Sequence, residues 1–147
     1  MTGGTGGFVQ DNMSRSYAAG TVRALHCQKP PNAQGKLVRV SRGRIRDVAV
    51  DLRRASPSYG RHVAVDLDAR NVQLFWVPPG FAHGFATLEP DTEVTFKTTA
   101  PYSPEDEIGL AWDDPDLAID WGVSRAEAVL SDRDRAQPPF ATLASPF

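Results

Sequence analysis

The sequence predicts an all-β fold, a sandwich or barrel of short strands. Apolar residues alternate with other residues in short runs, as they do on strands with one buried face. Twelve prolines and twelve glycines among 147 residues interrupt these runs often. No stretch with helical periodicity exceeds about ten residues, except near the C-terminus. Together these observations favour many short strands over long helices.

Length and composition indicate one domain that is long enough to bury a core. A net charge of −2 favours neither nucleic acid nor an anionic membrane as a partner. The lone cysteine, Cys27, excludes an internal disulfide and indicates a reducing compartment. No apolar run could span a membrane, and MTGGTGG lacks the apolar core of a signal peptide. We therefore expect a cytoplasmic protein with a flexible segment over residues 1–7 and a single domain over residues 8–147.

The first half of the chain predicts four strands. Residues 8–16 begin as a strand and end as a polar turn, and residues 20–28 place His26 on one face with Val22 and Ala24. Residues 36–40 form the next strand, and a hairpin-type turn at residues 41–43 leads into residues 44–52. One face of that last strand carries small and acidic side chains, which suggest either a cavity lining or a face turned to solvent: Ile45, Asp47, Ala49 and Asp51.

The second half predicts further short strands and a helical tail. Residues 61–67 and 93–98 read as strands, and residues 72–77 are apolar enough for a central strand. The sequence FAHGF then forms a turn around His83. Residues 108–112 and 117–121 are predicted to be short strands. Two capping-box spacings, Ser124 with Glu127 and Ser131 with Asp134, predict short helical turns near the C-terminus.

His26 is the first candidate for chemistry. A lone histidine on an apolar strand face is most often a packed core residue. Here Arg23 precedes it by three residues and Lys36 follows it by ten. A titratable base flanked by two fixed cations suits an anionic substrate that gives up a proton. Two other candidates also have local explanations: Asp134 could only cap a one-turn helix, and His83 could only satisfy backbone groups in its turn.

Other chemistries find little support. The three histidines, at positions 26, 62 and 83, are solitary, so we expect no metal and no cofactor. Cys27 follows His26 directly, and neighbours on a strand point to opposite faces, so the two cannot form a nucleophile and its base. The glycines near the N-terminus lack the preceding strand that a phosphate-binding loop requires.

Eight motifs, taken in order, resemble the dTDP-4-dehydrorhamnose 3,5-epimerase family. They are FVQDN (8–12), VRALHCQ (22–28), NAQGKLVRV (32–40), DVAVDLRRASPSYG (47–60), VPPGFAHGF (77–85), YSPEDE (102–107), WDDP (112–115) and LSDRD (130–134). This family is a metal-free branch of the cupins. The resemblance implies a cupin-type jelly-roll β-barrel with a short helical C-terminal segment, a homodimer, and a nucleotide-sugar or related carbonyl substrate.

The resemblance also implies roles for single residues. His26 would be the general base, Asp134 would orient and charge it, and Lys36 would stabilise the enolate oxygen. The remaining matched positions line the family's substrate site: Gln10, Asn12, Arg23, His83, Phe96, Tyr102, Glu107 and Arg133. Arg23 and His26 have opposite parity on an ideal strand. Both can line one pocket only if a bulge or a strand end lies between them.

Two departures from the family pattern bear on function. Phe96 stands where the family has the tyrosine that returns the proton, and a positioned general acid contributes about 10²–10⁴ in rate. We therefore expect at least one of two epimerisations to be disabled, unless Tyr102 or a water molecule substitutes. Nothing in residues 1–7 resembles the family's N-terminal arm, which crosses to the partner subunit. This predicts either a shortened form with an open pocket or a different substrate.

Three hypotheses follow. The first is an epimerase that acts next to the ketone of a dTDP-linked 4-keto-6-deoxy sugar, with epimerisation at a single carbon as a variant. The second is the same base and cation acting on another carbonyl compound, such as a natural-product intermediate. The third is a non-catalytic binding relative, which we rank last because it has no reason to keep the base, the acid and the cation. Under the first two, activity falls on the acid side as the base becomes protonated.

Overall fold

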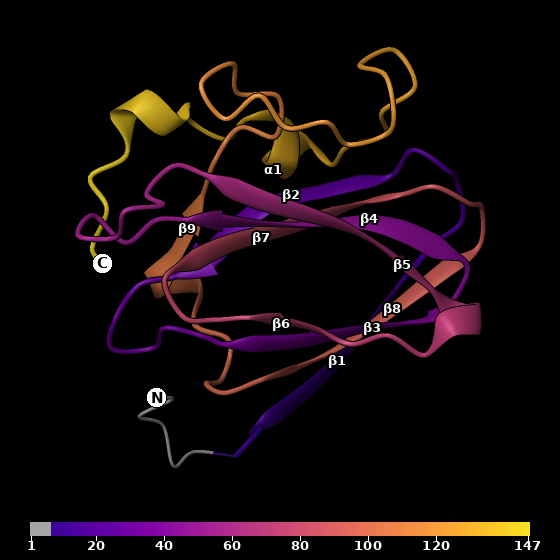
Figure 1. Cartoon of the computed structure of the whole chain (residues 1–147), viewed down its shortest axis with the longest axis horizontal. Helices are drawn as coiled ribbons and strands as arrows, with labels where there is room; N and C mark the ends of the chain where they lie inside the picture. The colour runs from indigo at the N-terminus through magenta and orange to yellow at the C-terminus, as the bar shows by residue number, and fades with distance from the viewer. Residues whose placement is uncertain (1–6) are drawn as a thin grey trace.

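Two antiparallel β-sheets face each other in the computed structural model, which describes residues 7–147 (Figure 1). The four-stranded sheet runs in the order β1 (Gln10–Ser16), β8 (Thr92–Thr98), β3 (Lys36–Arg42) and β6 (Phe75–Val77). The five-stranded sheet runs in the order β5 (His62–Asp68), β4 (Arg44–Asp51), β7 (Phe81–Thr87), β2 (Val22–Gln28) and β9 (Glu107–Gly109). The predicted all-β jelly-roll architecture is confirmed. Residues 1–6 of the segment expected to be flexible lie outside the described residues.

The helices are short and lie between or after the strands. They are η1 (Ala69–Asn71), η2 (Pro104–Asp106), α1 (Asp132–Arg135) and η3 (Phe140–Thr142). The expected helical segment near the C-terminus is present, because Ser131 caps α1 through its side chain. Ser124 and Glu127 also exchange the expected hydrogen bonds, but they close a turn and no helix follows. Within residues 7–147, no helix is long and apolar enough to cross a membrane.

One apolar core fills the space between the two sheets. Its buried residues come from alternate positions of both sheets: Val38, Val40, Ile45, Ala49, Leu67, Val77, Phe85 and Val94. Ile45 and Ala49 therefore point inward as predicted, but they belong to this dry core and not to a cavity wall. Asp47 lies between them on β4 and is fully buried.

A second apolar core lies on the other face of the five-stranded sheet, where the C-terminal third of the chain covers it (Figure 1). Trp112, Leu117 and Trp121 pack there, and Trp121 Nε1 donates a hydrogen bond to the carbonyl of Trp112 at 2.7 Å. Two strand predictions are wrong in this region. Residues 117 and 118 lie in a turn and residues 119–121 are irregular, and the strand expected over residues 108–112 is paired only over Glu107–Gly109. Beyond Gly109 the backbone of Leu110 still exchanges two hydrogen bonds with Leu25 of β2, and the residues that follow cover the sheet mainly through their side chains.

Three further predictions fail at strand ends. Residues 41–43 do not form a hairpin, because β3 and β4 belong to different sheets and the chain turns a corner between them. Gly43 has φ +77°, and a Cβ there would lie 2.3 Å from the hydroxyl of Thr92. The strand over residues 72–77 is short and lies at the edge of its sheet. The polar end of residues 8–16 is strand throughout, from Gln10 to Ser16.

The register of β2 changes between Arg23 and His26. Because of this irregularity, Val22 and Ala24 pack in the second apolar core, on the outer face of the five-stranded sheet, while His26 faces the space between the sheets. The prediction that these three residues share one face is therefore wrong. The bulge that Arg23 and His26 required in order to line one pocket is present.

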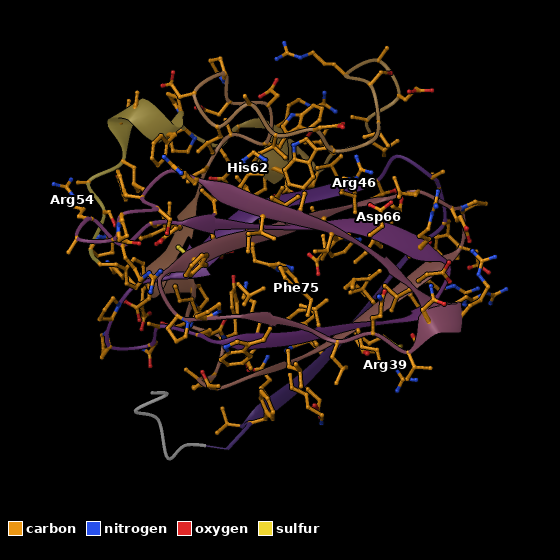
Figure 2. All side chains as sticks on the ribbon, in the orientation of Figure 1. Arg39, Arg46, Arg54, His62, Asp66 and Phe75 are labelled. Atoms are coloured by element: carbon orange, nitrogen blue, oxygen red, sulfur yellow. The ribbon has the colours of Figure 1, made fainter. Side chains whose placement is uncertain are left out.

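Charged side chains of β4 and of the edge strand β5 lie on the surface of the five-stranded sheet (Figure 2). Arg46 on β4 and Asp66 on β5 are cross-strand partners, and Arg46 Nε donates to Asp66 Oδ1 at 2.8 Å. His62 begins β5 and does not line the cavity described below.

Candidate active site

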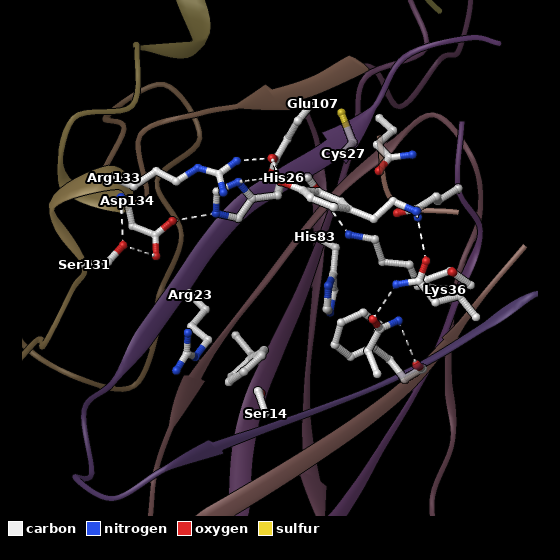
Figure 3. A pocket seen from close by; sticks show the side chains of 18 residues that line it. Ser14, Arg23, His26, Cys27, Lys36, His83, Glu107, Ser131, Arg133 and Asp134 are labelled. Carbon is white, nitrogen blue, oxygen red and sulfur yellow. Dashed lines mark hydrogen bonds and ion pairs between the residues drawn. The ribbon is translucent and has the colours of Figure 1, made fainter. Parts of the chain in front are cut away.

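A cavity of about 410 Å³ lies between the two sheets (Figure 3). The structure brings together around it every residue to which the family resemblance assigned a role in the site: Gln10, Asn12, Arg23, His26, Lys36, His83, Phe96, Tyr102, Glu107, Arg133 and Asp134. They come from both sheets, from the segment around η2 and from α1. Seven further residues complete the lining: Ser14, Cys27, Gln28, Gln34, Phe85, Thr98 and Ser131.

His26 is bonded to a buried carboxylate. Its Nε2 lies 2.5 Å from Asp134 Oδ1, and Asp134 is only 6% exposed. Burial alone would raise the pKa of Asp134, but the hydrogen bond and charge of His26, with the Ser131 hydroxyl, outweigh it and lower that pKa. Asp134 is therefore ionised at neutral pH and can orient the imidazole and stabilise its protonated form.

Asp134 owes its position to the cap of α1. Its backbone N–H donates to Ser131 Oγ at 3.1 Å, and Ser131 Oγ donates back to Asp134 Oδ2 at 3.0 Å. The local explanation for Asp134 and its contact with His26 are thus compatible. One carboxylate oxygen completes the helix cap, and the other meets the ring.

Lys36 supplies a cation at the start of β3. Its Nζ donates to the carbonyl of His26 at 3.4 Å. Burial lowers the pKa of Lys36, and the nearby Cys27 and Asp47 offset this only in part. Within the described chain, no carboxylate forms an ion pair with Lys36, so its charge is available to an oxygen atom of a ligand.

His83 lies on β7 and not in the turn that the sequence suggested. Its Nε2 is 2.5 Å from Asp47 Oδ1, and the second oxygen of Asp47 has no hydrogen-bond partner among residues 7–147. The predicted alternative, in which His83 only satisfies turn backbone, is therefore wrong. A fully buried carboxylate needs a partner, and this imidazole provides it.

Glu107 stands at the second nitrogen of the His26 ring. Its Oε1 lies 3.2 Å from His26 Nδ1, while the Tyr102 hydroxyl donates to its Oε2 at 2.8 Å. Arg133 also forms an ion pair with Glu107 (Figure 3). The imidazole thus lies between two carboxylates, one from α1 and one from β9.

The wall contributed by the four-stranded sheet carries Phe96 from β8. Its half-buried ring cannot donate a proton, and the nearby Asn12 amide is turned to the Phe96 carbonyl at 3.4 Å. Arg23 lines the cavity from β2, and no hydrogen bond or ion pair to its side chain occurs within residues 7–147. Arg23 therefore offers a second cation to a ligand.

Strand alternation could have found some of the lining residues that sequence reasoning missed. Ser14 follows Gln10 and Asn12 on the inner face of β1, Phe85 follows His83, and Thr98 follows Phe96. Cys27 packs mainly in the second apolar core, on the outer face of the five-stranded sheet, and burial raises the pKa of its thiol to about 11. In the described part of the chain, no group of three or more His, Cys, Asp or Glu side chains could hold a metal ion.

Known proteins place this fold and cavity in a family. The family model described as dTDP-4-dehydrorhamnose 3,5-epimerase matches residues 1–142. The protein of that name from Sinorhizobium fredii is 52% identical over 141 residues, which are 96% of this chain and 72% of that protein. The Pseudomonas aeruginosa protein of that name is 50% identical over 134 residues, 91% of this chain and 72% of its own.

Solved structures agree. The Legionella pneumophila dTDP-6-deoxy-D-glucose-3,5-epimerase, crystallised with dTDP-4-keto-L-rhamnose, superposes with a TM-score of 0.90 at 44% identity, covering 96% of this chain and 73% of that one. A Bacillus anthracis dTDP-4-dehydrorhamnose 3,5-epimerase with TDP and pyrophosphate bound superposes with a TM-score of 0.89 at 48% identity, covering 93% and 77%. On this agreement of sequence and fold, the chain belongs to the dTDP-4-dehydrorhamnose 3,5-epimerase family.

Proposed function

We propose that this chain is an epimerase that acts on a dTDP-linked 4-keto-6-deoxy sugar. It removes a proton from a carbon next to the ketone and returns a proton on the other face. The observation that carries the proposal is the contact of 2.5 Å between His26 and the buried Asp134 in the cavity that Lys36 also lines. The names of the relatives in the family support the same substrate class.

His26 is the proposed base and Asp134 its partner. As the C–H bond breaks, the proton moves to the imidazole and the electron pair moves onto the ketone as an enolate. Ionised Asp134 stabilises the imidazolium that forms. The Lys36 ammonium stabilises the enolate oxygen, and a preorganised group of this kind contributes about 3–4 kcal/mol of barrier reduction.

Return of the proton distinguishes this chain from a double epimerase. Phe96 offers no proton from the wall opposite His26, so we propose that Tyr102 or a water molecule returns the proton, and that epimerisation proceeds at one carbon only if that donor reaches only one. The remaining lining residues are proposed to bind substrate: Gln10, Asn12, Arg23, His83, Glu107 and Arg133. Of these, Arg23 suits the anionic diphosphate, because guanidinium groups pair with phosphate oxygens.

Solvent exchange tests the proposal directly. Wild-type protein incubated in deuterium oxide with a dTDP-4-keto-6-deoxyhexose should introduce deuterium at carbon 3 or carbon 5, and His26→Ala should abolish this. Mass spectrometry and NMR of the recovered sugar identify the carbon. Absence of exchange with wild-type protein at every enzyme concentration would count against the proposal. Exchange unaffected by His26→Ala would remove the assigned base.

We further propose a homodimer in the cytoplasm. The outer face of the four-stranded sheet exposes large apolar side chains: Met13 is 69% exposed, Leu74 is 60% exposed and Trp76 is 39% exposed. A groove runs there past Met13, Leu37 and Leu74. Free, buried Cys27 is consistent with a reducing compartment. Sedimentation of wild-type protein and Leu74→Glu tests the dimer. A monomeric wild type would contradict it.

A further inference from the structure

Both ring nitrogens of His26 face a carboxylate (Figure 3). Nε2 is bonded to Asp134 at 2.5 Å, and Nδ1 lies 3.2 Å from Glu107 Oε1 without a hydrogen bond. A neutral imidazole carries one N–H and can satisfy only one of the two carboxylates. The protonated ring carries two and can satisfy both. A carboxylate therefore stands at each ring nitrogen, where it can accept a hydrogen bond from the protonated ring.

Glu107 is held in this position from behind. The Tyr102 hydroxyl donates to Oε2 at 2.8 Å, and Arg133 pairs with the same oxygen. The Glu107 side chain is only 12% exposed. The carboxylate is thus fixed with Oε1 toward the imidazole, and little solvent screens its charge.

The other charged groups near His26 do not cancel this effect. From α1, Arg133 is engaged with Glu107 and Asp134 with the ring itself. From β3, Lys36 bonds the backbone carbonyl of His26 and not its ring. From β7, His83 is the ladder partner of His26 but is bonded to Asp47. The groups that meet the ring nitrogens are therefore two carboxylates.

We propose that Glu107 is a positioning residue for the base: a second carboxylate that stabilises protonated His26 and so makes it a stronger base. The inference rests on the proposed function, since it takes His26 as the base. The reaction itself is unchanged: the proton passes from the sugar carbon to Nδ1, because Nε2 already carries the hydrogen that is bonded to ionised Asp134, and the electron pair passes to the enolate. Tyr102 and Arg133 moderate the effect, because they draw part of the charge of Glu107 away from the ring.

Paired substitutions test the charge of Glu107 without altering its shape. Glu107→Gln should move the acid limb of the kcat/KM profile to lower pH by about one unit or more, because an opposite charge close to the ring has been removed. The plateau above that limb should fall about tenfold, because a weaker base transfers the proton more slowly. Glu105→Gln removes one negative charge from an exposed position of η2 and should change neither the pH of the acid limb nor the height of the plateau. Tyr102→Phe should move the limb the opposite way.

The protonation of His26 can also be followed without substrate. In ring NMR spectra, assigned through His26→Gln, the protonation midpoint of His26 should fall to lower pH in Glu107→Gln and stay in place in Glu105→Gln. An unmoved midpoint in a folded Glu107→Gln protein would overturn the inference, and so would a loss of activity with the acid limb unmoved. Failure of the proposed function looks different, since wild-type protein would then show no exchange whatever the midpoint does.

Discussion

His26 and His83 are partners in the ladder between β2 and β7, and each ring is bonded through Nε2 to its own aspartate at 2.5 Å. The aspartates come from different elements, Asp134 from the helix α1 and Asp47 from the strand β4. The two pairs differ in access: the His26 side chain is 21% exposed and that of His83 is 8% exposed. The more open pair is the one suited to exchanging a proton with a ligand.

Asp134→Asn should lower kcat by about 10²–10⁴ while the protein stays folded, because the amide keeps the shape but cannot stabilise an imidazolium. Asp132→Asn is the matched control, since Asp132 lies on the same helix and is exposed. Steady-state rates of solvent exchange measure both. Equal rates in the two variants would show that Asp134 serves only as part of the helix cap.

Lys36 should set an alkaline limb in the pH profile. Burial lowers the pKa of Lys36, so the ammonium loses its proton, and activity falls, at a pH below the usual lysine range. Lys36→Arg should remove this limb, since arginine stays charged, and Lys36→Met should lower kcat about 10²–10³-fold. The kcat profile between neutral and alkaline pH measures this. An alkaline limb that persists in Lys36→Arg would assign it to another group.

The same shift predicts how stability depends on pH. Because the pKa of Lys36 is lower in the folded protein, the unfolded chain binds more protons between the two values, and stability rises with pH across that window. Urea unfolding of wild type should show this rise, and Lys36→Met should lack it. If the free energy of unfolding of wild type is constant across that pH window, or falls in parallel with that of Lys36→Met, the lowered pKa does not belong to Lys36.

Phe96→Tyr should restore a proton donor on the wall opposite His26. If the missing hydroxyl limits exchange at one carbon, the variant should introduce deuterium there about 10²–10⁴ times faster than wild type. Phe96→Leu, which changes the ring without adding a hydroxyl, is the control. Deuterium analysis at carbons 3 and 5 separates the two positions. No gain at either carbon would mean that another group already returns the proton.

Asp51 should be important for stability and not for chemistry. Burial alone would raise its pKa, but hydrogen bonds from Arg53, Ser56 and Ser58 outweigh this and hold it far below 3.8. The resulting stabilisation is complete above the ordinary aspartate range and is lost as pH falls toward the lowered value. Asp51→Asn should cost about 2–3 kcal/mol in urea unfolding at neutral pH.

The surface ion pair of Asp66 with Arg46 provides the comparison for Asp51. Because that pair is exposed, Asp66→Asn should cost less than about 1 kcal/mol. Below pH 3 the gap between Asp51→Asn and wild type should narrow. A gap that stays constant down to that pH would mean that Asp51 acts through packing and not through its charge.

Alternation in the sequence was enough to predict most strands and that Ile45 and Ala49 share one face. The cap spacing of Ser131 and Asp134 was enough to predict α1, because a cap involves only neighbouring residues. Alternation could not reveal that β3 and β4 lie in different sheets, since that depends on which distant strands they pair with. It also misplaced His26 relative to Val22, because a register shift is set by the neighbouring strand β7.

The contacts between side chains in the cavity were harder to predict than the list of residues that line it. The family motifs brought Glu107 and His26 to one site, yet no pattern indicated that the carboxylate faces Nδ1. That contact joins β2 to β9 across the intervening strands of the chain, and the side chains of Tyr102 and Arg133 fix its geometry. Such a relationship is a property of the folded chain as a whole.

The carboxylate partner of His26 follows all the strands of the described chain, because α1 begins at Asp132. Every strand of the described chain is therefore complete in the sequence before the group that completes the base. A product trimmed before α1 would contain the residues of every strand and would lack the carboxylate that His26 needs for turnover. Turnover of substrate therefore shows that the chain extends past residue 134. Binding of a nucleotide alone would not show this.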